Sequence, residues 1–356
     1  MALPKFAQVS QGFHSELKKR ISEYFTSTGE KPTGNWRLYS KALVLTLSYV
    51  AMFTHLIFFD PVLWVAIAEC IVLGTATAFI GFNIMHDGAH GSFSTSPAVN
   101  KLAAISLNVL GGSSFMWNIK HNIIHHAYTN VDGVDDDIDA GILLRMARTQ
   151  RYLKLHKFQH VYFWFLYAIL YIYWIFVSDY RKYFSGKIGS MPLKKMSFGD
   201  HFAFWGYKLL HIGLFIALPI YFHGFTAWLV GFLIFSTVAG FILSIVFQLA
   251  HTVEHTHFPM PDEHTGRMAD EWAIHQIKTT ANFATHNKLV SWCVGGLNFQ
   301  VEHHLFPKIS HVHYPRINKI VKQTCKEFGV EYIEYPSVRK AIKSHINYLK
   351  EMGKAA

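Results

Sequence analysis

The fold is decided by residues 42–90, which read ALVLTLSYVAMFTHLIFFDPVLWVAIAECIVLGTATAFIGFNIMHDGAH. This stretch contains no Lys or Arg, and its two apolar runs, 42–59 and 62–85, are each long enough to cross about 30 Å of hydrocarbon as a helix. The Asp60-Pro61 pair between the runs predicts a tight turn. The stretch therefore predicts a membrane hairpin that ends in the motif His-Asp-Gly-Ala-His.

The composition and a second apolar region also indicate a membrane protein. Of the 356 residues 51% are hydrophobic and only 16% are charged, whereas soluble domains average about a quarter charged residues. Two further apolar runs, 203–222 and 226–250, are joined by His223-Gly224-Phe225. Lys208 lies in the first of them and is expected to snorkel towards its near end. We therefore expect an all-α integral membrane protein with four transmembrane helices in two hairpins.

Histidines are concentrated in four clusters. The clusters are His86-Asp-Gly-Ala-His90, His121-Asn-Ile-Ile-His125-His126, His251-Thr-Val-Glu-His255 and Gln300-Val-Glu-His303-His304. Residues four apart project from one face of a helix, so we expect His86 and His90 to bind one ion, and likewise His121 and His125. His126 points about 100° further round, towards a second ion. A lone histidine usually packs in a core, but four clusters at ligand spacing indicate a metal centre.

The number of histidines suggests two metal ions. A structural zinc site needs only four ligands, mostly with Cys, and a catalytic zinc usually takes three. A redox-active pair such as iron fits a ligand set of eight or more imidazoles better, although spacing does not name the element. The carboxylate-rich di-iron bundle is a poor match because only Glu254 to His257 has the Glu-x-x-His spacing. The three cysteines are scattered and form no metal motif.

Basic residues predict the orientation in the membrane. Residues 1–41 are rich in Lys and Arg, whereas neither hairpin tip has any, so the positive-inside rule places the amino terminus in the cytoplasm. A further apolar run, 161–177, has basic flanks on both sides, and we interpret it as interfacial. A fifth crossing would separate the first two histidine clusters from the last two. The run 101–116, broken by a Gly-Gly pair, is interpreted in the same way.

This topology brings all four clusters to the cytoplasmic edge of the membrane, under a helical cap. It divides the chain into a cytoplasmic amino-terminal segment (1–41), a membrane domain (42–310) and a cytoplasmic helical segment (311–356). The net charge of +10 favours anionic lipid head groups over nucleic acid, because the basic residues follow the topology and form no nucleic-acid-binding motif.

Three of the clusters resemble the histidine boxes HxxxH, HxxxHH and QxxHH of the membrane fatty acid desaturase family. The second box lies in WNIKHNIIHHAYTN (117–130) and the third in GLNFQVEHHLFP (296–307), and all three match in order and spacing. The resemblance extends from about residue 42 to the end of the chain. Gln300 in place of a histidine is similar to the front-end, linoleoyl-CoA desaturase-like subgroup, which inserts a double bond between an existing one and the carboxyl end.

The resemblance implies an oxidoreductase that uses two iron ions (Fe²⁺/Fe³⁺) and O₂ on a fatty acyl chain carried by coenzyme A or a lipid. The implied iron ligands are His86, His90, His121, His125, His126, His251, His303 and His304. Gln300 would replace a histidine, binding weakly or through water, and the extra His255 either contacts metal or lines the site. The chain lacks the His-Pro-Gly-Gly motif of a fused cytochrome domain, so we expect a separate ferredoxin or cytochrome as electron donor.

Polar residues beside the boxes are candidates to support the ligands, because a ligating imidazole needs a partner on its second nitrogen. These candidates are Asp87, Asn118, Asn122, Asn130, Glu254 and Glu302, with solvation of helix ends as the alternative. The acidic run 132–139 is expected either to support the site or to face head groups or water. Asn282 is a candidate for a water-mediated contact to iron. The remaining histidines, among them His275 and His311, are expected to have packing roles.

Two other functions fit parts of the pattern. A lipid or carotenoid hydroxylase or ketolase on the same di-iron scaffold would add oxygen to the product, whereas a desaturase removes two hydrogens, and mass spectrometry distinguishes these outcomes. A histidine-lined metal transporter would need ligands across the membrane midplane, whereas these clusters gather at one edge. An unactivated methylene C–H bond has no acidic proton, so either enzyme would need a metal-activated oxidant.

Overall fold

The computed structural model describes residues 3–7 and 12–355, and this part of the chain is mostly helical. The α-helices are α1 (Phe13–Thr28), α2 (Trp36–Phe58), α3 (Leu63–Ile80), α4 (His86–Ala89), α5 (Pro97–Val109), α6 (Ser114–Trp117), α7 (His126–Tyr128), α8 (Gln159–Tyr173), α9 (Asp179–Ser185), α10 (Phe198–Ile212), α11 (Leu218–His251), α12 (Trp272–Thr279), α13 (Lys288–Cys293), α14 (Gln300–Leu305), α15 (Tyr314–Phe328) and α16 (Val338–Met352).

Wider and tighter helical turns adjoin several of these helices. The π-helical segments are η1 (Gly81–Met85), η2 (Asn118–His125), η4 (Trp174–Ser178) and η5 (Gly213–Ala217), and the 3₁₀ segments are η3 (Lys154–Phe158) and η6 (His311–His313). The strands are β1 (Lys187–Ile188), β2 (Met191–Pro192), β3 (Asn282–Phe283) and β4 (Glu334–Tyr335). β1 pairs antiparallel with β2, and β3 pairs parallel with β4.

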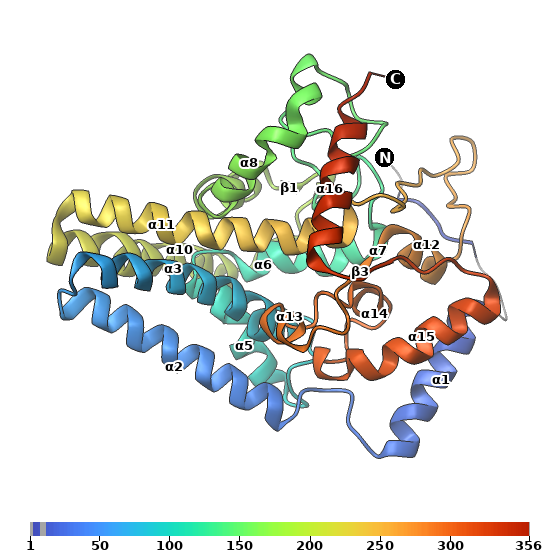
Figure 1. Cartoon of the computed structure of the whole chain (residues 1–356), viewed down its shortest axis with the longest axis horizontal. Helices are drawn as coiled ribbons and strands as arrows, with labels where there is room; N and C mark the ends of the chain where they lie inside the picture. The colour runs from blue at the N-terminus through green and yellow to red at the C-terminus, as the bar shows by residue number, and fades with distance from the viewer. Residues whose placement is uncertain (1–2, 8–11, 356) are drawn as a thin grey trace.

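Long apolar helices make up one end of the molecule. The stretches that are long and apolar enough to cross a membrane are Trp36–Phe58, Leu63–Ala89, Lys154–Ser185 and Phe198–His251. In Figure 1, α2 folds back on α3 and α10 on α11, with both turns at the same end. The two turns touch, since His223 Nε2 lies 3.0 Å from the Ile57 carbonyl oxygen.

The first helix pair begins earlier than the predicted span. Asn35 caps α2, because its Oδ1 accepts a hydrogen bond from the backbone N of Arg37 (3.0 Å). Lys41 therefore lies within the helix and is buried. Its Nζ donates to Asn83 Oδ1 (2.5 Å) and lies 3.0 Å from His311 Nε2. The amino group thus ties α2 to η1 and η6 instead of reaching water.

The second pair reverses direction at the predicted link. Gly224 has φ 77° and ψ 166°, and Trp228 Nε1 donates to the Phe215 carbonyl oxygen (2.9 Å) across the turn. The expectation that Lys208 snorkels is wrong. Its side chain is buried and donates to Asp179 Oδ2 (2.8 Å), because α9 offers a carboxylate inside the protein. This ion pair ties α10 to α9.

Small residues let the apolar helices pack closely around α11. A Cβ atom at Gly74 would lie 2.4 Å from the Phe235 carbonyl oxygen, and one at Gly240 would lie 2.7 Å from the Ala168 carbonyl oxygen. Glycine therefore allows α11 to contact α3 and α8 backbone to backbone. The outer side of α2 exposes apolar side chains such as Leu43, which is 59% exposed. Such a surface suits contact with lipid tails.

The two apolar runs interpreted as interfacial behave differently. Residues 161–177 lie in α8 and η4, which the length and composition of Lys154–Ser185 would allow to cross a membrane. Tyr167 on this helix has its hydroxyl 2.8 Å from His345 Nε2 of α16. The second run bends by 112° between α5 and the stretch Ser114–Tyr128, at the predicted glycine pair.

Candidate metal centre

The eight histidines predicted as ligands meet inside the protein, where four separate parts of the chain come together. His86 and His90 lie at the two ends of α4, η2 carries His121 and His125, and α7 begins with His126. The remaining three are His251 at the end of α11 and His303 and His304 on α14. Figure 1 shows the end of α11 close to α14 and α7. η2, which carries two of these histidines, and η1, which directly precedes His86, are π-helical, a feature that is frequent at functional sites. All eight side chains are buried.

These histidines form two adjacent groups. Within each group, the possible ligand atoms all lie within 4.8 Å of one another. The first group is His86, His90, His121 and His303, and the second is His125, His251 and His304. His126 joins them, because it forms a further group with His303 and His304, and its ring centroid lies 4.4 Å from that of His304. The arrangement can therefore hold two neighbouring metal ions.

His121 belongs to the first group and His125 to the second, but the two also share a potential metal-binding group, so their binding to one ion stays a prediction. Their rings are nearly parallel, with an interplanar angle of 21° and centroids 5.0 Å apart. Both rings also lie near Asp137, with which they form this shared group.

The acidic run supports these two histidines. His125 Nδ1 donates to Asp135 Oδ2 (2.9 Å), and His121 Nδ1 donates to Asp137 Oδ2 (3.1 Å). Asp135 is itself held by the backbone N of Asn130 (2.9 Å). These bonds fix each ring with Nδ1 protonated and Nε2 directed into the centre. This run was expected either to support the site or to face head groups or water. In the structure, the carboxylates of Asp135 and Asp137 contact the histidines.

Several ring nitrogens of these eight histidines are buried without a hydrogen-bond partner in the described chain. They are Nε2 of His90, His121, His125 and His303, and both nitrogens of His126. An unpaired buried polar atom costs about 1–3 kcal/mol. A concentration of such nitrogens at one point therefore suits metal ligation. Burial holds the pKa of His303 and of His304 well below 6.5. Both rings are thus neutral at physiological pH, which is the form that binds metal.

Further contacts orient ligand rings and were not predicted from the sequence. His304 Nδ1 lies 2.8 Å from Gln276 Oε1, and His303 Nδ1 lies 3.1 Å from the Tyr314 hydroxyl. Trp117 stacks on His121, with centroids 4.5 Å apart. Gln276 and Tyr314 carry no spacing signal, because they reach the site only through tertiary folding.

The candidates for weaker or indirect metal contacts lie in different places. Gln300 lies beside the second group, with its Nε2 3.1 Å from His251 Nε2 and its Oε1 buried without a partner in the described chain. His255 is exposed and belongs to none of the groups in the described chain. Asn282 faces α14, because its Oδ1 accepts from the backbone N of Val301 (2.9 Å). These contacts give it a structural partner on α14.

Asp87 and Asn122 hold the segments that carry the ligands and do not bind the ligand rings. Asp87 Oδ2 accepts from Ser310 Oγ (2.7 Å) and from His311 Nδ1 (3.0 Å). Asn122 Nδ2 donates to the Ala89 carbonyl oxygen (2.9 Å) and thereby joins η2 to α4. The polar residues thus link the elements on which the histidines lie.

Glu302 and Glu254 differ in burial. Glu302 is buried and accepts hydrogen bonds from Asn318 Nδ2 (3.1 Å) and the Tyr332 hydroxyl (2.8 Å), and burial raises its pKa to about 7. It therefore anchors α14 to α15. Glu254 lies near the surface and accepts from Asn347 Nδ2 (3.2 Å). Neither carboxylate contacts a ligand ring.

Comparisons with known proteins agree with this site. Residues 61–336 match the family model described as fatty acid desaturase. The chain is 37% identical to the sn-1 linoleoyl-lipid 6-desaturase of Synechocystis sp., over 99% of this chain and 98% of that protein. It is 35% identical to the protein of the same name from Arthrospira platensis, over 96% and 93%.

A further relative is the acyl-lipid (8-3)-desaturase of Physcomitrium patens, which is 35% identical over 97% of this chain and 72% of that protein. The family match covers most of the chain, and these relatives agree with the front-end subgroup that Gln300 predicts. The chain belongs to the fatty acid desaturase family and is an oxidoreductase of its front-end subgroup.

Proposed function

We propose that this desaturase uses two iron ions and O₂ to introduce a double bond into a lipid-linked acyl chain, between an existing double bond and the carboxyl end. The observation that carries the proposal is the pair of adjacent imidazole groups with unpaired buried nitrogens. The relatives named linoleoyl-lipid 6-desaturase and acyl-lipid (8-3)-desaturase support a lipid carrier. They also support a new double bond on the carboxyl side of an existing one.

The residues fit a pair of iron ions. One ion would be held by the first group and the other by the second, with His126 between them and Gln300 as a weak or water-mediated ligand. Iron bound there would supply the O₂ chemistry that removes two hydrogens from the acyl chain. Asp135, Asp137 and Gln276 would keep the Nδ1 side of their histidines occupied, so that Nε2 stays available.

The electrons are proposed to come from a separate carrier of the ferredoxin or cytochrome type, since the sequence contains no His-Pro-Gly-Gly motif. The ligand set would serve a hydroxylase equally well, because both reactions begin at an unactivated C–H bond. Here the relatives' names favour desaturation.

We also propose that the metal centre lies at the cytoplasmic face and that α8 is interfacial. Because all four histidine clusters meet at one place, the chain between His126 and His251 must cross the membrane an even number of times. α10 and α11 account for two crossings. α8 has Lys154 before it and Arg181 after it, and its Tyr167 contacts the cap helix α16. These features support an interfacial helix.

The test is to express the chain in a host of known fatty acid composition and to map new double bonds by mass spectrometry. The expected product has lost two hydrogens on the carboxyl side of an existing double bond. The His125→Ala variant should make none. A product that has gained oxygen would assign the site to hydroxylation, and unchanged lipids with an iron-loaded protein and a working electron donor would refute the proposal.

A further inference from the structure

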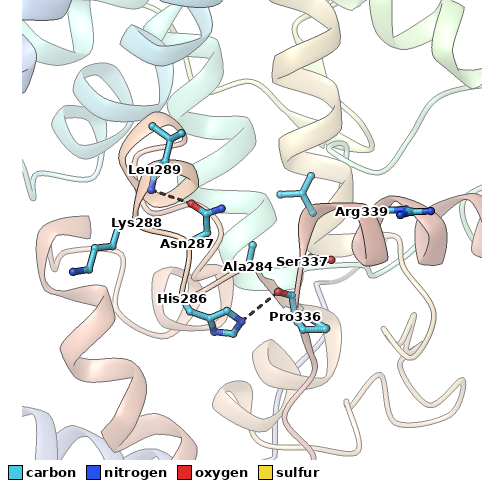
Figure 2. A pocket seen from close by; sticks show the side chains of 9 residues that line it. Ala284, His286, Asn287, Lys288, Leu289, Pro336, Ser337 and Arg339 are labelled. Atoms are coloured by element: carbon cyan, nitrogen blue, oxygen red, sulfur yellow. Dashed lines mark hydrogen bonds between the residues drawn. The ribbon is translucent and has the colours of Figure 1, made fainter.

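A surface groove separate from the metal centre lies between the start of α13 and the start of α16 (Figure 2). Its volume is about 740 Å³. Lys288 lies on one side and Arg339 on the other, with His286 and Pro336 between them. The residues assigned to the metal centre do not line this groove.

The shape of the groove is fixed by backbone pairing beneath it. Ala284 is buried at φ 49°, a left-handed conformation that costs a non-glycine residue on the order of 1 kcal/mol. It is held there because its N donates to the Tyr335 carbonyl oxygen (2.8 Å) beside the β3–β4 pair. His286 Nε2 lies 3.2 Å from the Pro336 carbonyl oxygen and ties the two walls together. The groove is therefore preformed.

The groove is positively charged. Lys288 and Arg339 are exposed, and neither side chain makes a hydrogen bond or ion pair within the described residues. The neighbouring carboxylate, Glu334, is already paired with Lys322 and accepts from the Thr285 hydroxyl. The α16 amino terminus also opens into the groove and has no acidic residue in its first turn. Two unpaired cations and a helix dipole of the same sign favour an anion.

The same wall carries apolar side chains typical of a membrane surface. On α13, Leu289 is 71% exposed and Trp292 is 44% exposed. The Trp292 ring lies 5.5 Å from Lys41 Nζ, near the start of the membrane helix α2. Tryptophan is enriched at the membrane–water interface, which favours a position of the groove at the level of the lipid head groups.

We propose that this groove binds the phosphate or sulfate group of an anionic membrane lipid. The cations would contact the head group while Leu289 and Trp292 contact its acyl region. A concave site bounded by a few residues suits a head group better than a protein partner, which usually needs about 800 Å² of surface. Asn282 of the underlying strand β3 binds α14, so the lipid would steady the cap near the metal centre. The proposal does not depend on the acyl position that is oxidised.

The test measures lipid binding to the full, iron-loaded chain in a zwitterionic detergent. Short-chain phosphatidylglycerol, short-chain phosphatidylcholine and inorganic phosphate are titrated separately by calorimetry. We expect phosphatidylglycerol to bind most tightly, and the pair Lys288→Gln and Arg339→Gln to weaken it by about tenfold per charge. A control with the same change of charge, Lys343→Gln and Lys350→Gln on exposed positions of α16, should bind like the wild type.

Iron content and gel-filtration profile establish that both variants are folded, and Arg339→Lys should restore most of the affinity. Equal binding of both lipids, or equal loss in the groove and control variants, would overturn the proposal. Phosphate binding as tight as phosphatidylglycerol binding would assign the groove to a free anion instead. Unchanged lipid affinity with a raised KM for the protein electron donor would assign it to protein docking.

Discussion

Removing the charge of Asp135 should weaken one metal site without unfolding the protein. Asp135 and His125 are both fully buried and joined by a 2.9 Å hydrogen bond. A hydrogen bond to a charged group contributes about 1.5–3 kcal/mol, which corresponds to roughly 10–150-fold in affinity. Measured losses for comparable outer contacts are about 10–100-fold. Asp135→Asn keeps the shape of the side chain, but it removes the charge and replaces one acceptor oxygen by an NH₂ donor that would face a backbone N–H or His125.

The assay is iron retention by the purified protein during titration with a chelator. We expect Asp135→Asn to release one iron ion at about 10–100-fold lower chelator concentration than the wild type, and to lose desaturation in parallel. Asp139→Asn is the matched control, because Asp139 is exposed in the same acidic run and bonds only the backbone N of Gly141. If both variants retain iron like the wild type, Asp135 does not support a ligand and the reasoning fails.

His303→Ala should remove most of the iron, measured by elemental analysis, and all desaturation. Lys208→Met should lower the free energy of unfolding by about 3–5 kcal/mol, measured by thermal unfolding in detergent, because it leaves Asp179 buried and unpaired. Burial lowers the pKa of His345 to about 4. The contribution of this residue to stability is therefore complete above pH 6.5 and should be lost as the pH falls towards 4. His345→Gln should flatten the melting-temperature profile between these two pH values.

Each of these predictions has a result that contradicts it. Full activity of His303→Ala would remove that residue from the ligand set. A Lys208→Met protein as stable as the wild type would show that the ion pair adds nothing, and the double variant with Asp179→Leu should recover most of the loss. An unchanged pH profile in His345→Gln would mean that other groups control acid stability.

The sequence was sufficient to predict the apolar helices and the gathering of histidines. Apolar length and turn residues are local properties, so the reversals near Asp60 and at Gly224 lie where they were expected. Histidine spacing is also local, and all eight expected ligands lie at the centre. The extra His255 differs, because it takes a left-handed backbone conformation beyond the end of α11 and faces outwards.

The remaining features depend on contacts between distant segments. Lys208 was expected to snorkel towards water, but carbonyl and carboxylate groups of other segments surround its amino group. Helical spacing paired His121 with His125, and the structure adds that each also belongs to a separate group with histidines from other segments. Gln276 comes from a helix that carries no metal-binding motif. Such partners appear only when the packing is known.

The most direct test of the central claim is the iron content and iron environment of the purified chain, measured together by elemental analysis and X-ray absorption. Two adjacent histidine groups predict two iron ions per chain, each bound mainly by imidazole nitrogen. The His125→Ala variant should retain fewer. One ion per chain, or a pair bound mainly by carboxylate oxygen, would contradict the account.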